Sequence, residues 1–171
     1  MNNADFLDAL VAYGVATRRA TRLHQPRPQV TEYLGDKIMK IATHLAYRPN
    51  FSNYTFRDEM ISDGIENCLR YIDNFDPKKS KNPFAYFTQI IYFAFIRRIK
   101  NEKTYMYRKY KIIEHTNTTN TASQPADGDV QQGVKRLSKV QYGEWSEERM
   151  HDFIHDFETT KRKVRMRHRN D

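Results

Sequence analysis

The stretch KNPFAYFTQIIYFAFIRRIKNEK, residues 81–103, holds the strongest pattern in this sequence. Its apolar residues recur at helical spacing, so it predicts a helix from 83 to about 111, with Pro83 in the first turn, where proline is tolerated. The residues expected to face a core are Phe87, Ile91, Ala94, Phe95 and Ile99. A second face of the same helix is also apolar and then becomes basic, so both sides of the helix need something to contact.

The second face consists of Gln89, Ile90, Phe93, Arg97 and Lys100. Two explanations stay open at this point. The helix could be buried nearly all round in a small bundle. Alternatively, the aromatic residues could form a platform for unstacked bases, while Lys and Arg hold the phosphates. Basic residues follow the aromatic segment at once, with tyrosines interleaved, and this clustering favours nucleic acid.

Three further helices are predicted upstream, over residues 4–20, 32–47 and 56–73, with prolines in the connections between the first two and directly after the second. The residues expected on their apolar stripes are Phe6, Leu7, Leu10, Val11, Val15, Leu34, Ile38, Ile41, Ala42, Leu45, Met60, Ile61, Ile65, Cys68, Leu69 and Ile72. The opposite face of the third helix is acidic. Few apolar runs alternate as strands do, so the sequence predicts an all-α fold.

Composition narrows the function classes. The chain has 171 residues, a net charge of +8 and 39% hydrophobic residues, which suits one domain with tails and an acidic partner such as nucleic acid. The single cysteine excludes a disulfide within the chain, and no zinc-ligand set is present. His151 and His155 lie four apart, but HDFIH lacks the glutamate of the HExxH motif. No enzyme activity, metal or cofactor is therefore expected.

The remaining sequence predicts location and domain layout. The first residues lack a signal-peptide pattern and no apolar run is long enough to span a bilayer, so a cytoplasmic protein without membrane contact is expected. Residues 112–140 are rich in Thr, Asn, Ser, Gln and Gly and are predicted to be a flexible linker. Four regions follow: 1–30 with an N-terminal helix and a proline-rich connector, a helical domain at 31–111, the linker at 112–140, and 141–171 with a helix at 144–160 and a basic tail.

Two segments of the helical domain are similar to a known family. DEMISDGIENCLRYIDNFDPKK and NPFAYFTQIIYFAFIRRI resemble region 2 of bacterial RNA polymerase sigma factors. The phrases EMISDGIE, NFD, KNPxAYxTQ and RIKxEK more closely resemble the late-transcription sigma factors of T4-like bacteriophages, over about residues 32–111. The resemblance implies a small helical bundle of sigma region 2 type, monomeric when free, that works in the cytoplasm of an infected bacterium.

The resemblance also implies a function and its residues. The chain would bind the core RNA polymerase of the host through the coiled coil of the β′ clamp, then recognise and open an A/T-rich −10-like element of promoter DNA. The residues implied for polymerase docking are Glu59, Ser62, Asp63, Ile65, Glu66 and Leu69. The residues implied for DNA contact are Phe75, Lys78, Lys79, Phe84, Tyr86, Gln89, Ile90, Phe93, Arg97, Arg98, Lys100 and Lys103.

The chain departs from the wider sigma family in two ways. Housekeeping sigma factors carry a Trp pair where this chain has Gln89 and Ile90, and an apolar Ile can wedge a base step but stacks less well. The chain also has no clear helix-turn-helix for a second promoter element. In the phage family a sliding clamp and a separate late coactivator compensate, and the clamp-binding residues implied here are Asp152, Phe153, Ile154 and Phe157. The alternative for this segment is an amphipathic helix that packs on its own chain.

Two rival functions belong to other classes. A free-standing nucleic-acid-binding protein would explain the aromatic and basic residues, but not the acidic third helix. An adaptor that occupies the polymerase clamp without reading DNA would explain the missing Trp pair.

Overall fold

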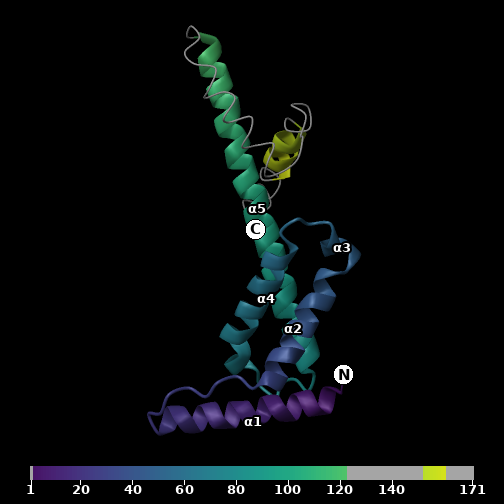
Figure 1. Cartoon of the computed structure of the whole chain (residues 1–171), viewed down its shortest axis with the longest axis vertical. Helices are drawn as coiled ribbons and strands as arrows, with labels where there is room; N and C mark the ends of the chain where they lie inside the picture. The colour runs from purple at the N-terminus through teal and green to yellow at the C-terminus, as the bar shows by residue number, and fades with distance from the viewer. Residues whose placement is uncertain (1, 123–151, 161–171) are drawn as a thin grey trace, which may run out of the picture. The chain divides into compact units, whose positions relative to one another are not determined.

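The computed structural model describes residues 2–122 and 152–160, and every regular element in these two ranges is helical (Figure 1). The elements are α1 (Asn3–Arg22), α2 (Glu32–Ala46), α3 (Pro49–Ser52), α4 (Arg57–Tyr71), the 3-10 turn η1 (Ile72–Asn74), α5 (Pro83–Ala122) and a further helix at 152–160. The chain divides into two compact units, Met1–Lys100 and Asn101–Asp171. The all-α prediction is confirmed for the described part of the chain.

Polar residues set the helix starts. The side chain of Asn2 accepts a hydrogen bond from the backbone N–H of Ala4, and Thr31 Oγ1 accepts one from Leu34 N–H at 3.4 Å. Asn82 Oδ1 accepts from Ala85 N–H at 3.1 Å, directly before the proline that opens α5. Each of these side chains satisfies a backbone donor that has no partner within its helix.

The core of the first unit forms where α2 packs against α1 and α4 and where α5 packs against α4. The predicted apolar stripe of α2 is buried throughout, and so is the inner stripe of α5. The prediction for Val15 was wrong, because its side chain is 53% exposed and Tyr13 is buried instead. The buried stripe of α1 runs through Phe6, Leu10 and Tyr13, and at about 3.6 residues per turn Val15 lies on the opposite side of the helix. Leu69, also predicted on a core stripe, is exposed.

The helices α4 and α5 approach closely at Gly64. A Cβ atom at Gly64 would lie 3.0 Å from Ile91 Cγ2 and 3.1 Å from Phe95 Cε1. Nearer the start of α5, Tyr86 donates a hydrogen bond to the Tyr71 carbonyl at 2.8 Å. These contacts pair the end of α4 with the start of α5, so the two helices run antiparallel.

Two features differ from the sequence predictions. The one-turn helix α3 was not predicted; Pro49, which was expected only to end the preceding helix, also occupies the first turn of α3. The helix α5 was expected to end near 111 but continues to Ala122, because no Gly or Pro interrupts residues 112–122. The rest of the predicted linker, the first part of the predicted 144–160 helix and the basic tail lie outside the described residues.

Candidate functional site

The outward face of α5 in the first unit is apolar and then basic. Phe93 is 55% exposed and Ile96 is 42% exposed, with Tyr92 beside them. Arg97 follows on the same face and is also exposed, as are Gln89 and Lys100. Large apolar side chains that gather on an exposed surface mark interaction sites. This face therefore offers rings for stacking and a cation for phosphate.

Ile90, the residue expected to wedge between bases, is not fully accessible to DNA. Its side chain is partly buried and packs against the core of the first unit. Phe93 and Ile96 are more accessible on the same helix. Any wedge contributed by this helix is therefore better placed at Phe93 than at Ile90.

Three aromatic residues predicted for DNA contact take part in packing. Phe75 is buried, and its ring centroid lies 5.2 Å from that of Tyr86. Phe84 is partly buried, and its ring centroid lies 5.0 Å from that of Phe6. The Tyr86 hydroxyl is engaged with the Tyr71 carbonyl. Phe75 and Tyr86 thus hold the start of α5 in place rather than presenting free rings.

The loop before α5 presents exposed lysines. Asp76 organises it: its side-chain Oδ1 accepts from Lys78 N–H at 2.9 Å, and its carbonyl accepts from Lys79 N–H at 3.1 Å. Both lysine side chains are exposed. The turn therefore displays two cations just before α5, and these are the lysines that the family resemblance implied for DNA contact.

The acidic face of α4 is mostly exposed. Glu59, Ser62, Glu66 and Leu69 are exposed, while Ile65 is half-buried. Glu66 is bridged to Arg70 one turn later on the same helix. This face is open to a basic partner surface, with Leu69 as an apolar contact.

Asp63 has a second role that the sequence did not reveal. Its Oδ2 atom lies 3.1 Å from Arg98 Nε on α5, and neither side chain is fully exposed. One turn further along α4, Asn67 Oδ1 lies 3.5 Å from Arg97 Nη1. The predicted polymerase-docking residue Asp63 and the predicted DNA-contact residue Arg98 therefore pair with each other and link α4 to α5.

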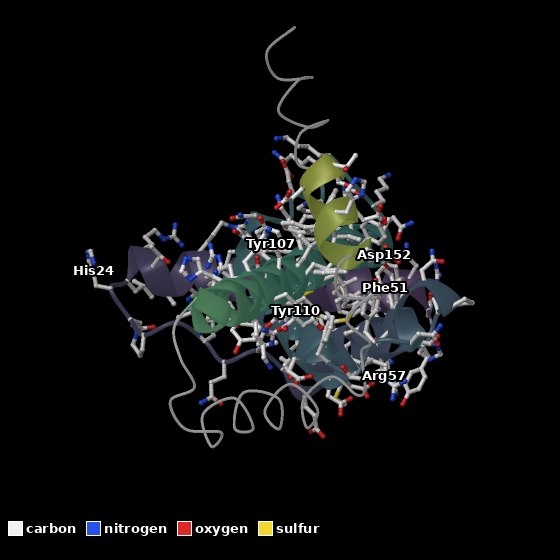
Figure 2. The ribbon with its side chains drawn as sticks, turned by 90° about the horizontal axis from the view of Figure 1, so that it is seen from above. His24, Phe51, Arg57, Tyr107, Tyr110 and Asp152 are labelled. Carbon is white, nitrogen blue, oxygen red and sulfur yellow. The ribbon has the colours of Figure 1, made fainter. Side chains whose placement is uncertain are left out.

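The second unit contains Lys103 and the residues predicted for sliding-clamp binding (Figure 2). Lys103 and Asp152 are exposed, whereas Phe153 and Phe157 are half-buried. Phe157 stacks on Tyr107 with ring centroids 4.7 Å apart, and Phe153 meets Tyr110 edge-on at 5.9 Å.

Polar contacts and burial complete this packing. Glu158 Oε1 accepts from the Tyr107 hydroxyl at 2.9 Å and lies 3.5 Å from Lys111 Nζ. Ile154 and Tyr110 are both buried. The 152–160 helix thus packs its apolar side on residues 107–111 of α5, which is the alternative that the sequence left open.

Burial also determines whether the thiol of Cys68 can act as a nucleophile. Desolvation raises the pKa of Cys68 to about 12, so the thiol stays protonated at neutral pH. A protonated core thiol is not a nucleophile. Burial likewise raises the pKa of Tyr86, with the nearby Cys68 adding to the shift. Among the described residues there is no group of three or more acidic, His or Cys side chains that could hold a metal ion.

Sequence reasoning missed a groove between α2 and α5 in the first unit. Two of its basic residues, Lys40 and His44, lie one turn apart on α2, and the third, Arg48, lies just beyond the end of that helix. The spacing of Lys40 and His44 places them on one helix face and could have been read from the sequence. Only the apolar stripe of α2 was interpreted from the sequence, as a face buried in the core, so these basic residues were given no role.

No family model matches this chain, and no curated protein matches its sequence. In the two ranges that the structure describes, no helix is long and apolar enough to cross a membrane.

Proposed function

We propose that this chain is an RNA polymerase sigma factor for phage late genes. It would bind the host core polymerase through the β′ clamp, and then recognise and open an A/T-rich −10-like promoter element. The observation that carries the proposal is the exposed apolar-to-basic face of α5, whose opposite face is buried in the core of the first unit. A helix that presents exposed Phe93 and Ile96 just before Arg97 suits unpaired bases next to a phosphate backbone.

The proposed opening step uses stacking energy. Each base that leaves the duplex can gain about 1–3 kcal/mol by stacking on an aromatic side chain. Exposed Phe93 is the first candidate for this contact, with Tyr92 next to it. Lys78, Lys79 and Arg97 would hold phosphates and make binding salt-dependent. An A/T-rich element suits the mechanism, because its flexible steps unstack at lower cost.

The proposed polymerase contact uses the exposed acidic face of α4. Glu59 and Glu66 would steer the chain toward a basic coiled coil, and Leu69 would provide an apolar contact. Asp63 belongs to this face in the family resemblance, but it also pairs with Arg98. Asp63 would therefore support the α4–α5 arrangement as well as docking.

The sliding clamp and the late coactivator would supply affinity that one small DNA-binding domain lacks. A tethered contact raises the local concentration of the promoter without adding promoter contacts. In the resemblance this contact is made by the segment Asp152-Phe153-Ile154 with Phe157. In the second unit Phe153 and Phe157 rest on tyrosines of α5, so clamp binding through these rings would first require their release.

The test separates the two faces of the first unit. Glu59→Lys with Glu66→Lys should weaken binding to bacterial core polymerase, whereas Phe93→Ala should leave that binding intact and abolish promoter opening. Val15→Ala, another exposed apolar position, is the matched control and should change neither. Opening that survives Phe93→Ala together with Arg97→Ala would favour an adaptor that reads no DNA. Tight DNA binding with no affinity for polymerase would favour a free-standing nucleic-acid-binding protein.

A further inference from the structure

The connector between α1 and α2 carries an arginine between two prolines. Pro26 and Pro28 fix their own φ angles, and the residue before each proline is restricted to extended conformations. Arg27 therefore projects from a backbone that has few alternative conformations. A residue in such a backbone loses little conformational freedom when its side chain makes a contact.

Two side chains hold the guanidinium group of Arg27. Its Nε atom donates a hydrogen bond to the Tyr13 hydroxyl at 3.1 Å, and that hydroxyl donates to the Pro28 carbonyl at 3.4 Å. Tyr13 is buried in the core, so its hydroxyl is a fixed acceptor. Arg27 Nη2 also lies 2.8 Å from Asp73 Oδ2. The connector is thus tied to η1, the turn that follows α4.

Asp73 lies just before the loop that carries the exposed lysines. Three residues later, the Asp76 side chain accepts a hydrogen bond from Lys78 N–H at 2.9 Å. The Asp76 carbonyl accepts from the N–H groups of Lys79 and Ser80, each at 3.1 Å. These bonds set the shape of the turn, while the contact of Asp73 fixes the end of the chain from which the turn starts.

The helix α1 holds the other end of the same loop. Asn3 Nδ2 donates a hydrogen bond to the Lys81 carbonyl at 3.0 Å. One turn further along α1, the Phe6 ring packs against Phe84 at the start of α5, with ring centroids 5.0 Å apart. Figure 1 shows α1 lying across the end of α4 and the start of α5. α1 and its connector therefore hold the loop at 76–82 from both ends.

We propose that Arg27 is a positioning residue for the promoter contact: through Asp73 it fixes the loop that presents Lys78 and Lys79. The inference rests on the proposed function, in which these lysines hold phosphates, and it extends the DNA-binding machinery to the connector before α2. Arg27 is already paired with a carboxylate, so it acts on DNA through the loop rather than by a phosphate contact of its own.

The sign of one charge change separates positioning from general electrostatics. Asp73→Ala removes a negative charge, so it should strengthen DNA binding if only the field of the protein acts. If the pair with Arg27 positions the loop, the same change should weaken binding, because the two lysines lose their fixed arrangement. Arg27→Ala should weaken binding under either explanation and serves as the second half of the pair.

The experiment measures binding of a fluorescent, A/T-rich phage promoter fragment by anisotropy, with the full chain in complex with core polymerase. Asp73→Ala and Arg27→Ala should each weaken binding about threefold, within the range expected of an exposed ion pair. Asp8→Ala and Arg19→Ala make the same charge changes at exposed positions of α1 that form no ion pair within the described part of the chain. The first control should not weaken binding, and the second should weaken it less than Arg27→Ala does.

A further variant tests whether Arg27 acts through the lysines. In a chain with both Lys78→Ala and Lys79→Ala, no cation remains for the loop to position. Adding Asp73→Ala to that chain should cause no further loss of affinity. A second threefold loss there would mean that the pair acts on DNA by another route and would overturn the inference.

Hydrogen exchange gives a measurement that needs no DNA. The amides of Lys78, Lys79 and Ser80 are bonded to Asp76, so their exchange rates report on the turn. Asp73→Ala and Arg27→Ala should each speed their exchange about threefold and leave the urea midpoint unchanged, because an exposed ion pair adds little to global stability. Faster exchange throughout the first unit, with a lower urea midpoint, would make the pair a general stabiliser and overturn the inference.

Two more outcomes would overturn the inference: tighter promoter binding by Asp73→Ala, and unchanged exchange of the turn amides in both variants. Failure of the proposed function looks different. If the wild-type chain never binds polymerase, yet both variants speed exchange of the turn, the hold of Arg27 on the loop stands and the sigma assignment falls. If the wild-type chain opens a promoter and both variants bind and exchange normally, the sigma assignment stands and the role of Arg27 falls.

Discussion

Replacing Gly64 by Ala tests the packing of α4 on α5, on which the exposed face of α5 depends. The new Cβ would lie 3.0 Å from Ile91 Cγ2 and 3.1 Å from Phe95 Cε1. Both neighbours are completely buried, and Phe95 is held from the other side by Phe51, with ring centroids 5.2 Å apart. The neighbours therefore have little room to yield, and the methyl group must strain the interface.

The magnitude follows from two opposing effects. Ala is better than Gly in a helix interior by about 0.5–1 kcal/mol. Overpacking a close interface costs about 1–3 kcal/mol. Gly35 on α2 provides the matched control, because a Cβ there meets nothing within 4 Å. We expect Gly35→Ala to raise the free energy of unfolding by about 1 kcal/mol and Gly64→Ala to lower it by up to about 2 kcal/mol.

Urea unfolding followed by far-UV circular dichroism measures both variants. The expected result is a lower urea midpoint for Gly64→Ala and a higher one for Gly35→Ala, with unchanged m-values. If Gly64→Ala were as stable as Gly35→Ala, the close approach of α4 and α5 at Ile91 and Phe95 would be wrong. The placement of the outward face of α5 would then lose its basis.

Three further predictions concern single side chains. Burial raises the pKa of Cys68 from 9.0 to about 12, so Ellman's reagent at pH 8 should modify this thiol only as fast as the chain unfolds, and fast labelling of the folded chain would contradict this. The stability that the neutral thiol contributes is present below pH 9 and is lost as the pH rises from about 9 to about 12. Tyr107→Ala removes the stack on Phe157 and the hydrogen bond to Glu158. Limited proteolysis should then cut the 152–160 helix faster, and the affinity of the chain for a sliding clamp should rise about 3–10-fold. Tyr105→Ala, at an exposed position of the same helix α5, should change neither the cleavage rate nor the affinity. Asp63→Lys places a cation beside Arg98, so it should lower both the urea midpoint and the affinity for polymerase. Glu59→Lys should lower the affinity for polymerase alone. Equal urea midpoints for the two variants would count against the Asp63–Arg98 pair.

Local periodicity predicted much of the fold. The stripe of α2 and the inner stripe of α5 could be assigned because a helix repeats every 3.6 residues, and all of those positions are buried. The same rule failed for Val15, because two adjacent apolar stripes fit the first helix, and only the packing shows that the stripe with Phe6, Leu10 and Tyr13 faces the core. The end of α5 was missed for another reason: a polar composition was taken to indicate a linker, although no Gly or Pro interrupts the helix before Ala122.

The sequence indicated on which helix face each candidate residue lies, but not which of these residues contact one another. The sequence placed Phe93 and Arg97 on the second face of the helix but left open whether that face is buried, and the structure shows both side chains exposed. The burial of Phe75 and the pairing of Arg98 with Asp63 depend on which elements meet in space, and sequence spacing carries no such information. The family resemblance placed Arg98 with DNA and Asp63 with polymerase, and so could not show that they contact each other.

The central claim is that this chain opens promoter DNA together with a bacterial polymerase. Permanganate mapping of unpaired thymines on supercoiled phage DNA tests it most directly, with core polymerase, the chain, a sliding clamp and its coactivator present. The account predicts reactive thymines about one helical turn upstream of a transcript start. This reactivity should need both the chain and the polymerase, and it should be lost with Phe93→Ala but kept with Val15→Ala. Unreactive thymines in the complete mixture, despite a stable complex of the chain with polymerase, would contradict the claim.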